Sequence, residues 1–373
     1  MHRRSTRLCW TLILLAISTT NAQRPGGSPF DRFDANKDGK VVRDEVPERL
    51  RERFDAIDAN KDGTITPEEQ RSYVLGQRPG GANLPPGVKA EKDIPYAGTK
   101  NPRQTLDLYL PEKPKGDRPL PVVVNIHGGA WLGGDKSGIG AIAGLVSSGD
   151  YAGVSVGYRL SGEAAWPSQI HDCKAAIRWI GANAEKYHLD PDRIGVIGGS
   201  AGGHLVAMLG TSGGVEALEG DLGPNKGVSS KVRCVVDEFG PAELATMGDA
   251  PSSTDHNSPT SPESKLLGAP IRQNPEKAKD ASPIAYVSKD DPPFLIIHGD
   301  KDMTVPFDQS ERLTKALKGA GVEVLFIRVK DGGHGGFRNP EIPRRVRQFF
   351  DKHLRDRPVG TISEEPVANA PER

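Results

Sequence analysis

The sequence predicts an α/β protein, with a mostly parallel central sheet covered by helices on both faces, preceded by a small all-α domain. Two observations predict the sheet: apolar, β-rich runs recur along residues 94–355, and amphipathic helical stretches lie between several of them. Continuous apolar strands that alternate with helices are typical of parallel sheets buried on both faces. A third observation, an acidic twelve-residue segment repeated in tandem within residues 28–75, predicts the separate helical domain.

The strand-like runs share an apolar, β-branched composition, and they are PVVVNIHGG (121–129), YAGVSVGYRL (151–160), RIGVIGGS (193–200), KVRCVVDEFG (231–240), PPFLIIHGD (292–300) and VEVLFIRVKDGG (322–333). Helical periodicity is clearest in DCKAAIRWIGANAEKYH (172–188) and SERLTKALKGAG (310–321). In open parallel sheets, ligands bind at the carboxyl ends of the strands. The notable polar clusters of this chain follow such ends.

Length and charge are those of a globular enzyme or binding protein. The chain has 373 residues, of which 36% are hydrophobic, enough for a core. Its 49 lysines and arginines balance 49 aspartates and glutamates, so the formal net charge is zero. Without an overall field to attract a polyanion, we expect no nucleic-acid partner.

The first residues have the pattern of an export signal. Arginines at positions 3, 4 and 7 flank the start of the apolar run LCWTLILLAI, and small residues end residues 1–22 before Gln23. A membrane anchor is the alternative, but the run is about half the roughly 20 residues that span a bilayer. We therefore expect a signal peptide over residues 1–22, no membrane span in the mature chain, and a secreted or periplasmic location.

Two further segments are predicted to lie outside the domains. Residues 76–93 are rich in proline and glycine and are predicted to be a linker. Residues 356–373, DRPVGTISEEPVANAPER, have few apolar side chains to bury, so they are predicted to be a disordered tail.

Cysteine content does not indicate a disulfide-built scaffold. Beyond the signal segment only Cys173 and Cys234 remain, the first in a helical stretch and the second in a strand-like run. Two separately buried thiols are favoured, and a bridge stays open in an oxidising compartment.

GGSAG, at 198–202, has the form G-x-S-x-G between a strand and a helix-like stretch. In that context the pattern is typical of a nucleophile elbow, a sharp turn that exposes the serine hydroxyl. Gly198 and Gly202 would permit the bend by avoiding collisions of side chains with the strand and the helix. The candidate nucleophile is Ser200.

A serine nucleophile needs a base, and the base needs an orienting carboxylate. In the order expected after an elbow, the acid precedes the histidine. Asp302 follows the strand FLII, and His334 follows the strand VLFIRV and is flanked by glycines. The predicted triad is Ser200, Asp302 and His334.

Some residues compete for these roles. Asp300 is a less favoured acid because the D-x-x-V-P stretch begins at Asp302. Asp237 or Glu238, at the end of the preceding strand, could supply the acid instead. His204, on the helix after the elbow, is interpreted as a packed or capping residue.

Stabilisation of an oxyanion requires preorganised N–H donors. The glycine-rich loop NIHGGAW, at 125–131, directly follows a strand and can supply them. The predicted donors are the backbone N–H groups of Gly129 and Ala130, together with that of Ala201 after the nucleophile. His127 is interpreted as bracing the loop by hydrogen bonding.

Through HGGAW, YRL, DPDRIGVIGGSAGGHL, DPPFLIIHGDKDMTVP and GGHGGF, residues 94–355 resemble α/β-hydrolase esterases of the hormone-sensitive-lipase and carboxylesterase type. The resemblance is strongest to the bacterial feruloyl/acetyl-xylan esterase-like group. It implies the α/β-hydrolase fold and the triad and oxyanion roles given above. Ala130 departs from the third glycine that the lipase loop often has, which could narrow the acyl pocket.

Segments 34–45 and 58–69, DANKDGKVVRDE and DANKDGTITPEE, both match D-x-[DN]-x-[DN]-G-x5-E and resemble an EF-hand pair that binds structural calcium. Val41 and Ile65, at position 8 of each loop, can pair, and VPERLRERFDAI (46–57) can be a shared helix. The predicted ligands are Asp34, Asn36, Asp38, Lys40 and Glu45 in the first loop, and Asp58, Asn60, Asp62, Thr64, Thr66 and Glu69 in the second.

Together these features predict a secreted serine carboxylic-ester hydrolase that acts through an acyl-enzyme on small acyl esters. No cofactor is expected for catalysis. The resemblance suggests acetyl or feruloyl esters of polysaccharides as substrates, and the EF-hand module could also bind a protein partner. Two alternatives remain: a peptidase of the same fold, and a non-catalytic, calcium-dependent extracellular interaction protein.

Overall fold

In the computed structural model, the described part of the chain comprises residues 33, 41–48, 51, 54, 57–58, 63–65 and 84–370. The chain divides into two compact units, Met1–Gln70 and Arg71–Arg373, which are described separately. The predicted signal peptide, residues 1–22, lies outside the described residues. Within the described part, no helix is both long and apolar enough to cross a membrane.

The first unit contains a short antiparallel pair, β1 (Val41–Val42) and β2 (Thr64–Ile65), with the 3-10 helix η2 (Arg43–Glu45) directly after β1. Val41 pairs with Ile65, which confirms the pairing expected between the position-8 residues of the two repeats. Among the described residues of this unit, the buried apolar side chains are those of Val41, Val46, Phe54 and Ile65. The repeat therefore joins its two loops through a strand pair and a small apolar cluster.

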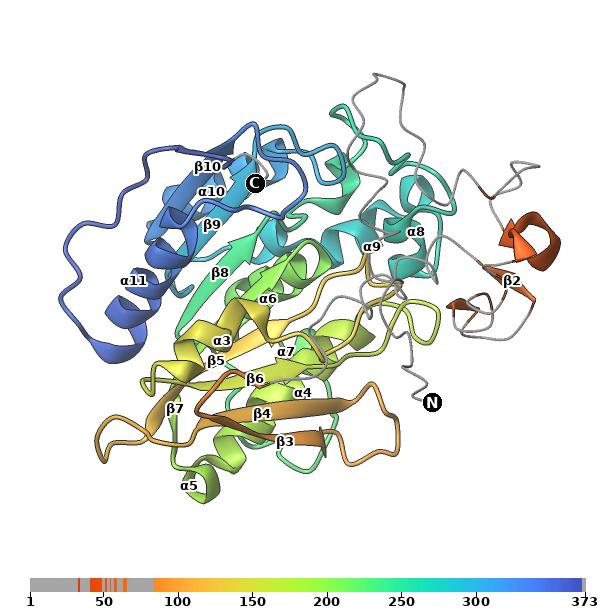
Figure 1. Ribbon diagram of the computed structural model, residues 1–373. Helices are drawn as coiled ribbons and strands as arrows, with labels where there is room; N and C mark the ends of the chain where they lie inside the picture. Colours follow the sequence, from red (N-terminus) through yellow and green to blue (C-terminus); the bar gives the residue numbers. More distant parts are fainter. Residues whose placement is uncertain are drawn as a thin grey trace, which may run out of the picture. The chain divides into compact units, whose positions relative to one another are not determined.

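The second unit is built on a 9-stranded sheet in the order β11-β10-β9-β8-β7-β5-β6-β4-β3 (Figure 1). Its strands pair in parallel except at β3/β4 and β4/β6, which are antiparallel. The strands are β3 (Val88–Pro95), β4 (Thr105–Pro111), β5 (Leu120–Ile126), β6 (Ala152–Val156), β7 (Leu189–Gly199), β8 (Cys234–Glu238), β9 (Phe294–Gly299), β10 (Val324–Lys330) and β11 (Val367–Ala368). Each of the predicted strand-like runs overlaps one of the strands β5 to β10, which confirms the mostly parallel sheet.

The helices of this unit, in chain order, are α3 (Gly140–Ser147), α4 (Ser168–Ala182), α5 (Ala184–Tyr187), α6 (Ala201–Thr211), α7 (Glu216–Glu219), α8 (Pro262–Leu267), α9 (Pro275–Asp280), α10 (Asp308–Gly319) and α11 (Glu341–Arg355). Short 3-10 turns are η4 (Leu244–Thr246), η5 (Ile271–Gln273) and η6 (Pro283–Tyr286). The two predicted helical stretches correspond to α4 with α5 and to α10. Most of the residues between β8 and β9 are in short helices and turns.

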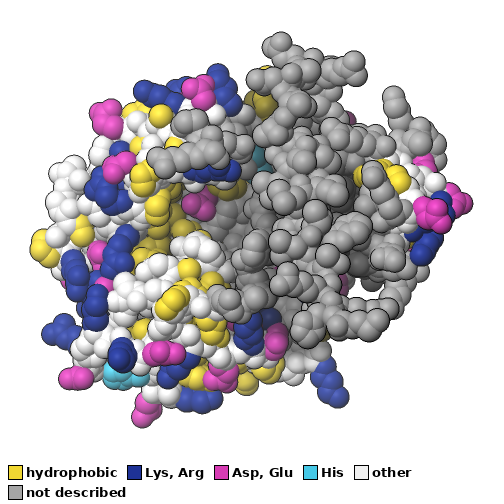
Figure 2. All heavy atoms as spheres, in the orientation of Figure 1, with side chains coloured by type: hydrophobic (Ala, Val, Ile, Leu, Met, Phe, Trp, Pro, Cys, Tyr) yellow, Lys and Arg dark blue, Asp and Glu magenta, His cyan; other side chains and the backbone are white. Residues whose placement is uncertain are grey.

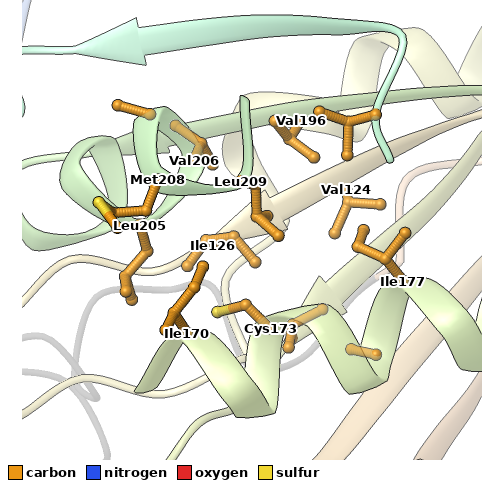
Figure 3. Close-up of a cluster of buried hydrophobic side chains, with 14 of the residues drawn as sticks. Val124, Ile126, Ile170, Cys173, Ile177, Val196, Leu205, Val206, Met208 and Leu209 are labelled. Carbon is orange, nitrogen blue, oxygen red and sulfur yellow. The ribbon is translucent and has the colours of Figure 1, made fainter. Parts of the chain in front are cut away.

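Apolar residues alternate between the two faces of the central strands. Val122 and Val124 of β5 belong to the core cluster with α4, α6 and α10, whereas Val123 belongs to the cluster with α3 and α11. In Figure 3, side chains of α4 point toward β5 within the first cluster; those labelled include Ile170, Cys173, Ile177, Val124 and Ile126. Burial on both faces explains why these strands are continuous apolar runs in the sequence.

The predicted linker over residues 76–93 is wrong at its carboxyl end, because β3 begins at Val88. This edge strand pairs antiparallel with β4, and its register shifts between Glu91 and Ile94. Exposed charged residues between the buried Val88 and Ile94 hide the strand pattern. A charged edge strand of this kind also blocks pairing with other chains.

The predicted disordered tail, residues 356–373, is wrong for its described part, residues 356–370. β11 adds to the sheet in parallel beside β10, with Val367 opposite Val329. Ile362 and Val367 are buried in the cluster on the α11 face, and Arg345 of α11 donates hydrogen bonds to the carbonyls of Ser363 and Glu365. The unpaired edge of β10 and these few apolar side chains are sufficient to order the segment.

Cys173 and Cys234 are both buried and free, which confirms the two separate thiols favoured by the sequence. Burial raises the pKa of each thiol.

On the surface, Lys and Arg side chains are interspersed with Asp and Glu over the visible described area (Figure 2).

A buried ion cluster fixes α4 to the α7 segment. Lys174 Nζ, fully buried, donates to Glu219 Oε1 at 2.6 Å and to the carbonyl oxygen of Ser212 at 2.7 Å. Arg178 Nη1, also buried, donates to the Glu219 carbonyl at 2.9 Å, and Ser230 Oγ donates to Glu219 Oε2 at 2.7 Å. Glu219 thus supplies the negative charge that faces both buried cations.

We expect Glu219→Gln to lower the free energy of unfolding by about 3 kcal/mol, because it leaves Lys174 buried without a counter-charge. Urea denaturation followed by circular dichroism measures this change. Glu216→Gln, an exposed neighbour on the same short helix, is the matched control, with an expected change of less than about 0.5 kcal/mol. Equal stabilities of the two variants would contradict this role of Glu219.

Candidate active site

Ser200 stands at the sharp turn between β7 and α6. Its backbone has φ 57° and ψ −124°, a strained conformation for a residue with a side chain. The flanking glycines permit it: a Cβ on Gly202 would lie 2.2 Å from the Ile126 carbonyl oxygen, and one on Gly198 would lie 2.5 Å from the Gly202 carbonyl oxygen. The turn therefore depends on close backbone contact with β5, as the predicted elbow requires.

The three residues predicted to form the triad meet at the carboxyl ends of the strands. His334 Nε2 lies 3.0 Å from Ser200 Oγ, and His334 Nδ1 lies 2.7 Å from Asp302 Oδ2. Asp302 follows β9 and His334 follows β10, so two loops 32 residues apart converge on the turn after β7. The geometry is that of a nucleophile, a base and an orienting carboxylate in hydrogen-bonded series.

Asp302 is held as an anion. Its side chain is fully buried, its Oδ1 accepts hydrogen bonds from the N–H groups of Thr304 and Val305, and its Oδ2 lies 3.2 Å from His298 Nε2. Burial raises the pKa of Asp302, but hydrogen bonds from His298 and His334 outweigh it and hold the pKa well below its usual range. The carboxylate is therefore ionised at neutral pH and accepts a hydrogen bond from the Nδ1–H group of His334.

The predicted oxyanion loop lies directly beside the nucleophile. A Cβ on Gly128 would be 3.5 Å from the Ser200 Cβ and 2.6 Å from the Gly199 carbonyl oxygen. Gly129 has φ 120°, and a Cβ there would meet the Gly133 carbonyl oxygen at 2.3 Å. Within the described part of the chain, the N–H groups of Gly129, Ala130 and Ala201 donate no hydrogen bond. They remain available as donors to a bound oxygen.

His127 braces this loop, as the sequence suggested. Its ring stacks on Tyr158 with centroids 4.2 Å apart, and the Tyr158 hydroxyl donates to the His127 carbonyl oxygen at 3.0 Å. Burial lowers the pKa of His127 to about 4, so the ring is neutral near pH 7. Tyr158 is fully buried, so it supports the loop by packing.

The competing acids lie away from His334. Asp300 accepts a hydrogen bond from Arg328 Nε at 2.8 Å and one from the Asp331 N–H. Asp237 accepts from the Gly240 N–H, and its Oδ2 is buried with no partner among the described residues. Burial raises the pKa of Asp237 and of Glu238 to about 7 each. Among the described residues, none of these three carboxylates is hydrogen-bonded to His334, whose Nδ1 faces Asp302.

The raised pKa of Asp237 predicts a pH-dependent stability. Because the folded pKa of about 7 exceeds the ordinary value of 3.8, the folded state holds the proton more tightly. The resulting stabilisation is complete below the ordinary pKa and is lost as the pH rises through about 7. Asp237→Asn stays neutral and keeps the oxygen that accepts from Gly240.

We expect the stability of Asp237→Asn relative to the parent protein to rise by at least about 1 kcal/mol between pH 5 and pH 8, because the parent protein loses this stabilisation over that range. Thermal melts across this pH range measure the difference. Glu238 still titrates in the variant, so the dependence weakens without vanishing. A constant difference in stability at both pH values would refute the assignment.

Sequence reasoning missed two aromatic or imidazole groups around the base. Phe239 has φ 47° and packs edge-on against His334, with centroids 4.9 Å apart. His298 contacts Asp302 through Nε2, and its Nδ1 lies 2.7 Å from Ser310 Oγ. The position of His298 at the end of β9, two residues before the D-x-D pair, was the available signal. Nothing in the sequence marked Phe239.

Most predicted calcium ligands, namely Asp34, Asn36, Asp38, Lys40, Asn60, Asp62, Thr66 and Glu69, lie outside the described residues. Of the others, Asp58 is buried, and its Oδ2 accepts from the Gly63 N–H at 2.9 Å. Glu45 Oε2 accepts from the Val42 N–H at 2.9 Å. No cluster of three or more His, Cys, Asp or Glu ligands occurs among the described residues. With the β1/β2 pair, the Asp58 turn fits the loop geometry of a calcium site.

Two family models match this chain. The model described as BD-FAE matches residues 106–317, more than half of the chain, and includes the elbow and Asp302. The model described as EF hand matches residues 29–45 and 50–71, which contain the two repeats.

Similar proteins are esterases. "Esterase LipC" of Mycobacterium tuberculosis is 31% identical over 63% of this chain, and "Esterase LipQ" of the same organism is 31% identical over 70%. The chain spans only 57% and 62% of the lengths of these two relatives. Among solved structures, a truncated carbohydrate esterase from gut microbiota is 36% identical, with a TM-score of 0.66 over 72% of this chain and 96% of that one. Esterase B from Lactobacillus rhamnosis, 24% identical with a TM-score of 0.65 over 83% of this chain and 97% of that one, shares the fold.

Proposed function

The chain belongs to the BD-FAE family, and from this premise we propose that it is a serine carboxylic-ester hydrolase that works through an acyl-enzyme. One observation carries the proposal: the hydrogen-bonded series from Ser200 through His334 to Asp302. The available N–H groups beside Ser200 add the donors that ester hydrolysis requires.

In the acylation step, Ser200 Oγ attacks the ester carbonyl carbon while His334 Nε2 takes the hydroxyl proton. Asp302 accepts from Nδ1 and stabilises the imidazolium that forms. The carbonyl oxygen becomes an oxyanion within reach of the N–H groups of Gly129, Ala130 and Ala201. Collapse of the intermediate then breaks the ester bond, and the proton on His334 goes to the leaving alcohol.

In the deacylation step, water takes the place of the alcohol. His334 removes a proton from the water, the hydroxide attacks the acyl carbonyl, and the same N–H groups stabilise the second oxyanion. Return of the proton to Ser200 Oγ releases the carboxylic acid. No step needs a metal or an organic cofactor from outside the chain.

For the substrate, we propose small acyl esters, with acetyl or feruloyl esters of polysaccharides as the physiological class. Support comes from the 36% identity to a carbohydrate esterase. A second similar structure, the bifunctional GH43-CE of Bacteroides eggerthii, is 37% identical with a TM-score of 0.65. An exported enzyme meets such polymers, and the signal-like residues 1–22 support export to the periplasm or beyond.

The test of the proposed activity combines labelling with a substrate panel. A fluorophosphonate should add to Ser200, which peptide mass spectrometry would locate, and p-nitrophenyl acetate should be hydrolysed. Acetylated and feruloylated xylan fragments would then be compared with long-chain acyl esters. Labelling at another residue, or no hydrolysis of any ester, would refute the proposal.

We further propose that residues 28–75 bind two calcium ions as a structural module. Calcium would link carboxylate and carbonyl oxygens within each loop and so stabilise this unit; the ligands would be those predicted from the repeats. Support comes from the EF hand match, the Val41/Ile65 pairing and the buried Asp58 turn.

Removing calcium with EGTA should therefore lower the temperature of a thermal transition that belongs to this module, because only the folded loops bind the ion tightly. Differential scanning calorimetry of the full chain, with and without calcium, measures the shift. Glu45→Gln with Glu69→Gln, which weakens the twelfth ligand of each loop, should make the two scans alike. A parent protein whose scans do not depend on calcium would contradict the module's role.

A further inference from the structure

The oxyanion loop is held in a strained backbone conformation. Ala130 has φ 55° and Trp131 has φ 58°, two consecutive residues with side chains in the left-handed region. A residue with a side chain is strained in this region, so the conformation persists only where surrounding contacts enforce it. The cause of the strain must therefore lie in what holds Trp131.

Trp131 is held at both ends. Its indole Nε1–H donates to His204 Nδ1 at 3.2 Å, and its carbonyl oxygen accepts from the Ser161 N–H at 2.8 Å and from the Ser161 hydroxyl at 3.1 Å. The side chain is 2% exposed, and its ring meets the His204 ring edge-on, with centroids 5.1 Å apart. These contacts fix both the side chain and the backbone of Trp131, the residue directly after Ala130.

His204 has a defined protonation state. Its Nε2 lies 2.6 Å from the carbonyl oxygen of Ala281, which can only accept, so Nε2 carries the proton and Nδ1 is free to accept from Trp131. The residue is fully buried, and burial lowers its pKa to about 4, which keeps the ring neutral. A neutral ring with this tautomer is the one form that makes both hydrogen bonds.

The location of His204 connects the two halves of the oxyanion site. It lies on α6, the helix that begins at Ala201 directly after the nucleophile. Its contact to Trp131 therefore ties the helix bearing one predicted donor to the loop bearing the other two. The contact to Ala281 anchors this connection to the segment before η6.

We propose that His204 is a positioning residue for the oxyanion site: through the Trp131 indole it holds Ala130 in the left-handed conformation that aims its N–H at the reacting carbonyl oxygen. This inference rests on the proposed esterase function. It assigns a role to a histidine that does not touch the substrate and that the sequence analysis interpreted as a packed or capping residue.

The test compares variants that remove the indole–imidazole bond with variants that keep it. Trp131→Phe loses the donor, His204→Leu loses the acceptor, and His204→Asn retains an oxygen near the Nδ1 position. Trp179→Phe, a conservative change of another largely buried tryptophan on α4, is the control. Each protein is first shown to be folded by circular dichroism and thermal melting.

With p-nitrophenyl acetate as the probe, Trp131→Phe and His204→Leu should each lower kcat about tenfold and leave KM within about twofold, because a misplaced donor affects the transition state more than substrate binding. The double variant should be no slower than either single variant, because both remove the same contact. His204→Asn should lose at most about threefold in kcat, and Trp179→Phe should match the parent protein.

A second readout does not depend on turnover. Exchange of the Trp131 indole N–H with solvent, followed by NMR, should be slow in the parent protein and in His204→Asn, and fast in His204→Leu. Slow exchange in His204→Leu, or singly substituted enzymes with the parent kcat, would overturn the inference, as would a double variant whose loss is the product of the single losses.

The two proposals fail in different ways. If the parent protein hydrolyses no ester while indole exchange behaves as expected, the proposed function fails and the inferred role in oxyanion stabilisation fails with it. If the parent protein is active and Ser200 is labelled, but the variants keep the parent kcat, only the positioning role of His204 fails.

Discussion

Ser200→Ala is expected to lower kcat for p-nitrophenyl acetate by about 10⁶-fold, the scale of loss when an activated serine is removed from a hydrogen-bonded triad. The reason is the 3.0 Å contact between Ser200 Oγ and His334 Nε2: without the hydroxyl, no covalent acyl-enzyme can form. The double variant Ser200→Ala/His334→Ala should be no slower than Ser200→Ala, because the two groups act as one unit. Steady-state kinetics with highly purified protein measures both.

The matched control for this variant is Ser148→Ala, which removes a hydroxyl at the end of α3 that donates to the Leu145 carbonyl and accepts from the Asp150 N–H. It should keep the parent kcat. Circular dichroism should show an unchanged fold for Ser200→Ala, since alanine fits where serine already lies. A Ser200→Ala enzyme within tenfold of the parent rate would exclude the acyl-enzyme mechanism.

Asp302→Asn is expected to lower kcat by about 10⁴-fold, because an amide nitrogen facing Nδ1 would favour the wrong tautomer of His334 and no longer stabilise its imidazolium form. The change is isosteric, and the oxygen that accepts from the Thr304 and Val305 N–H groups can be retained. The loss should therefore appear mainly in kcat, with KM nearly unchanged.

Asp300→Asn distinguishes this effect from a general loss of negative charge in the same loop. Asp300 lies two residues away but pairs with Arg328, 2.8 Å from its Nε. We expect its kcat to stay within about threefold of the parent value. Activity that falls equally in both variants would show that Asp302 is not the acid that orients His334. If Ser200 were still labelled in that case, His334 would have a different carboxylate partner.

Prediction of the fold succeeded where burial on two faces made strands uniformly apolar. The runs at β5 to β10 met this condition, and their alternation with helices indicated the parallel sheet. The edges did not meet it. In β3, exposed charges separate Val88 from Ile94, and β11 has two residues whose pairing depends on the free edge of β10.

At the candidate site, the groups that the sequence singled out and the structure brings together are those whose local sequence carries a distinct pattern. Glycines at the elbow and in the oxyanion loop mark places where a Cβ would meet backbone atoms, and Asp302 and His334 each follow a strand in the order the turn at Ser200 requires. Supporting contacts were marked less: His298 lies at the end of β9, but no local pattern pairs Tyr158 with His127 or His204 with Trp131. His298 on Asp302, Tyr158 on His127 and His204 on Trp131 join residues from 4 to 73 positions apart.

What the amino-acid order established was the kind of element in the central strands and their helices and the identity of the candidate reacting groups, because periodicity, glycine placement and strand ends are local properties. What the folded chain alone settled was which groups meet: His334 with Asp302 and not with Asp237, and a neutral His204 beneath the oxyanion loop. The first outcome depends on strand order, which determines the distances between groups. The second depends on burial, because packing by distant segments shifts the pKa of a side chain. A local pattern contains neither.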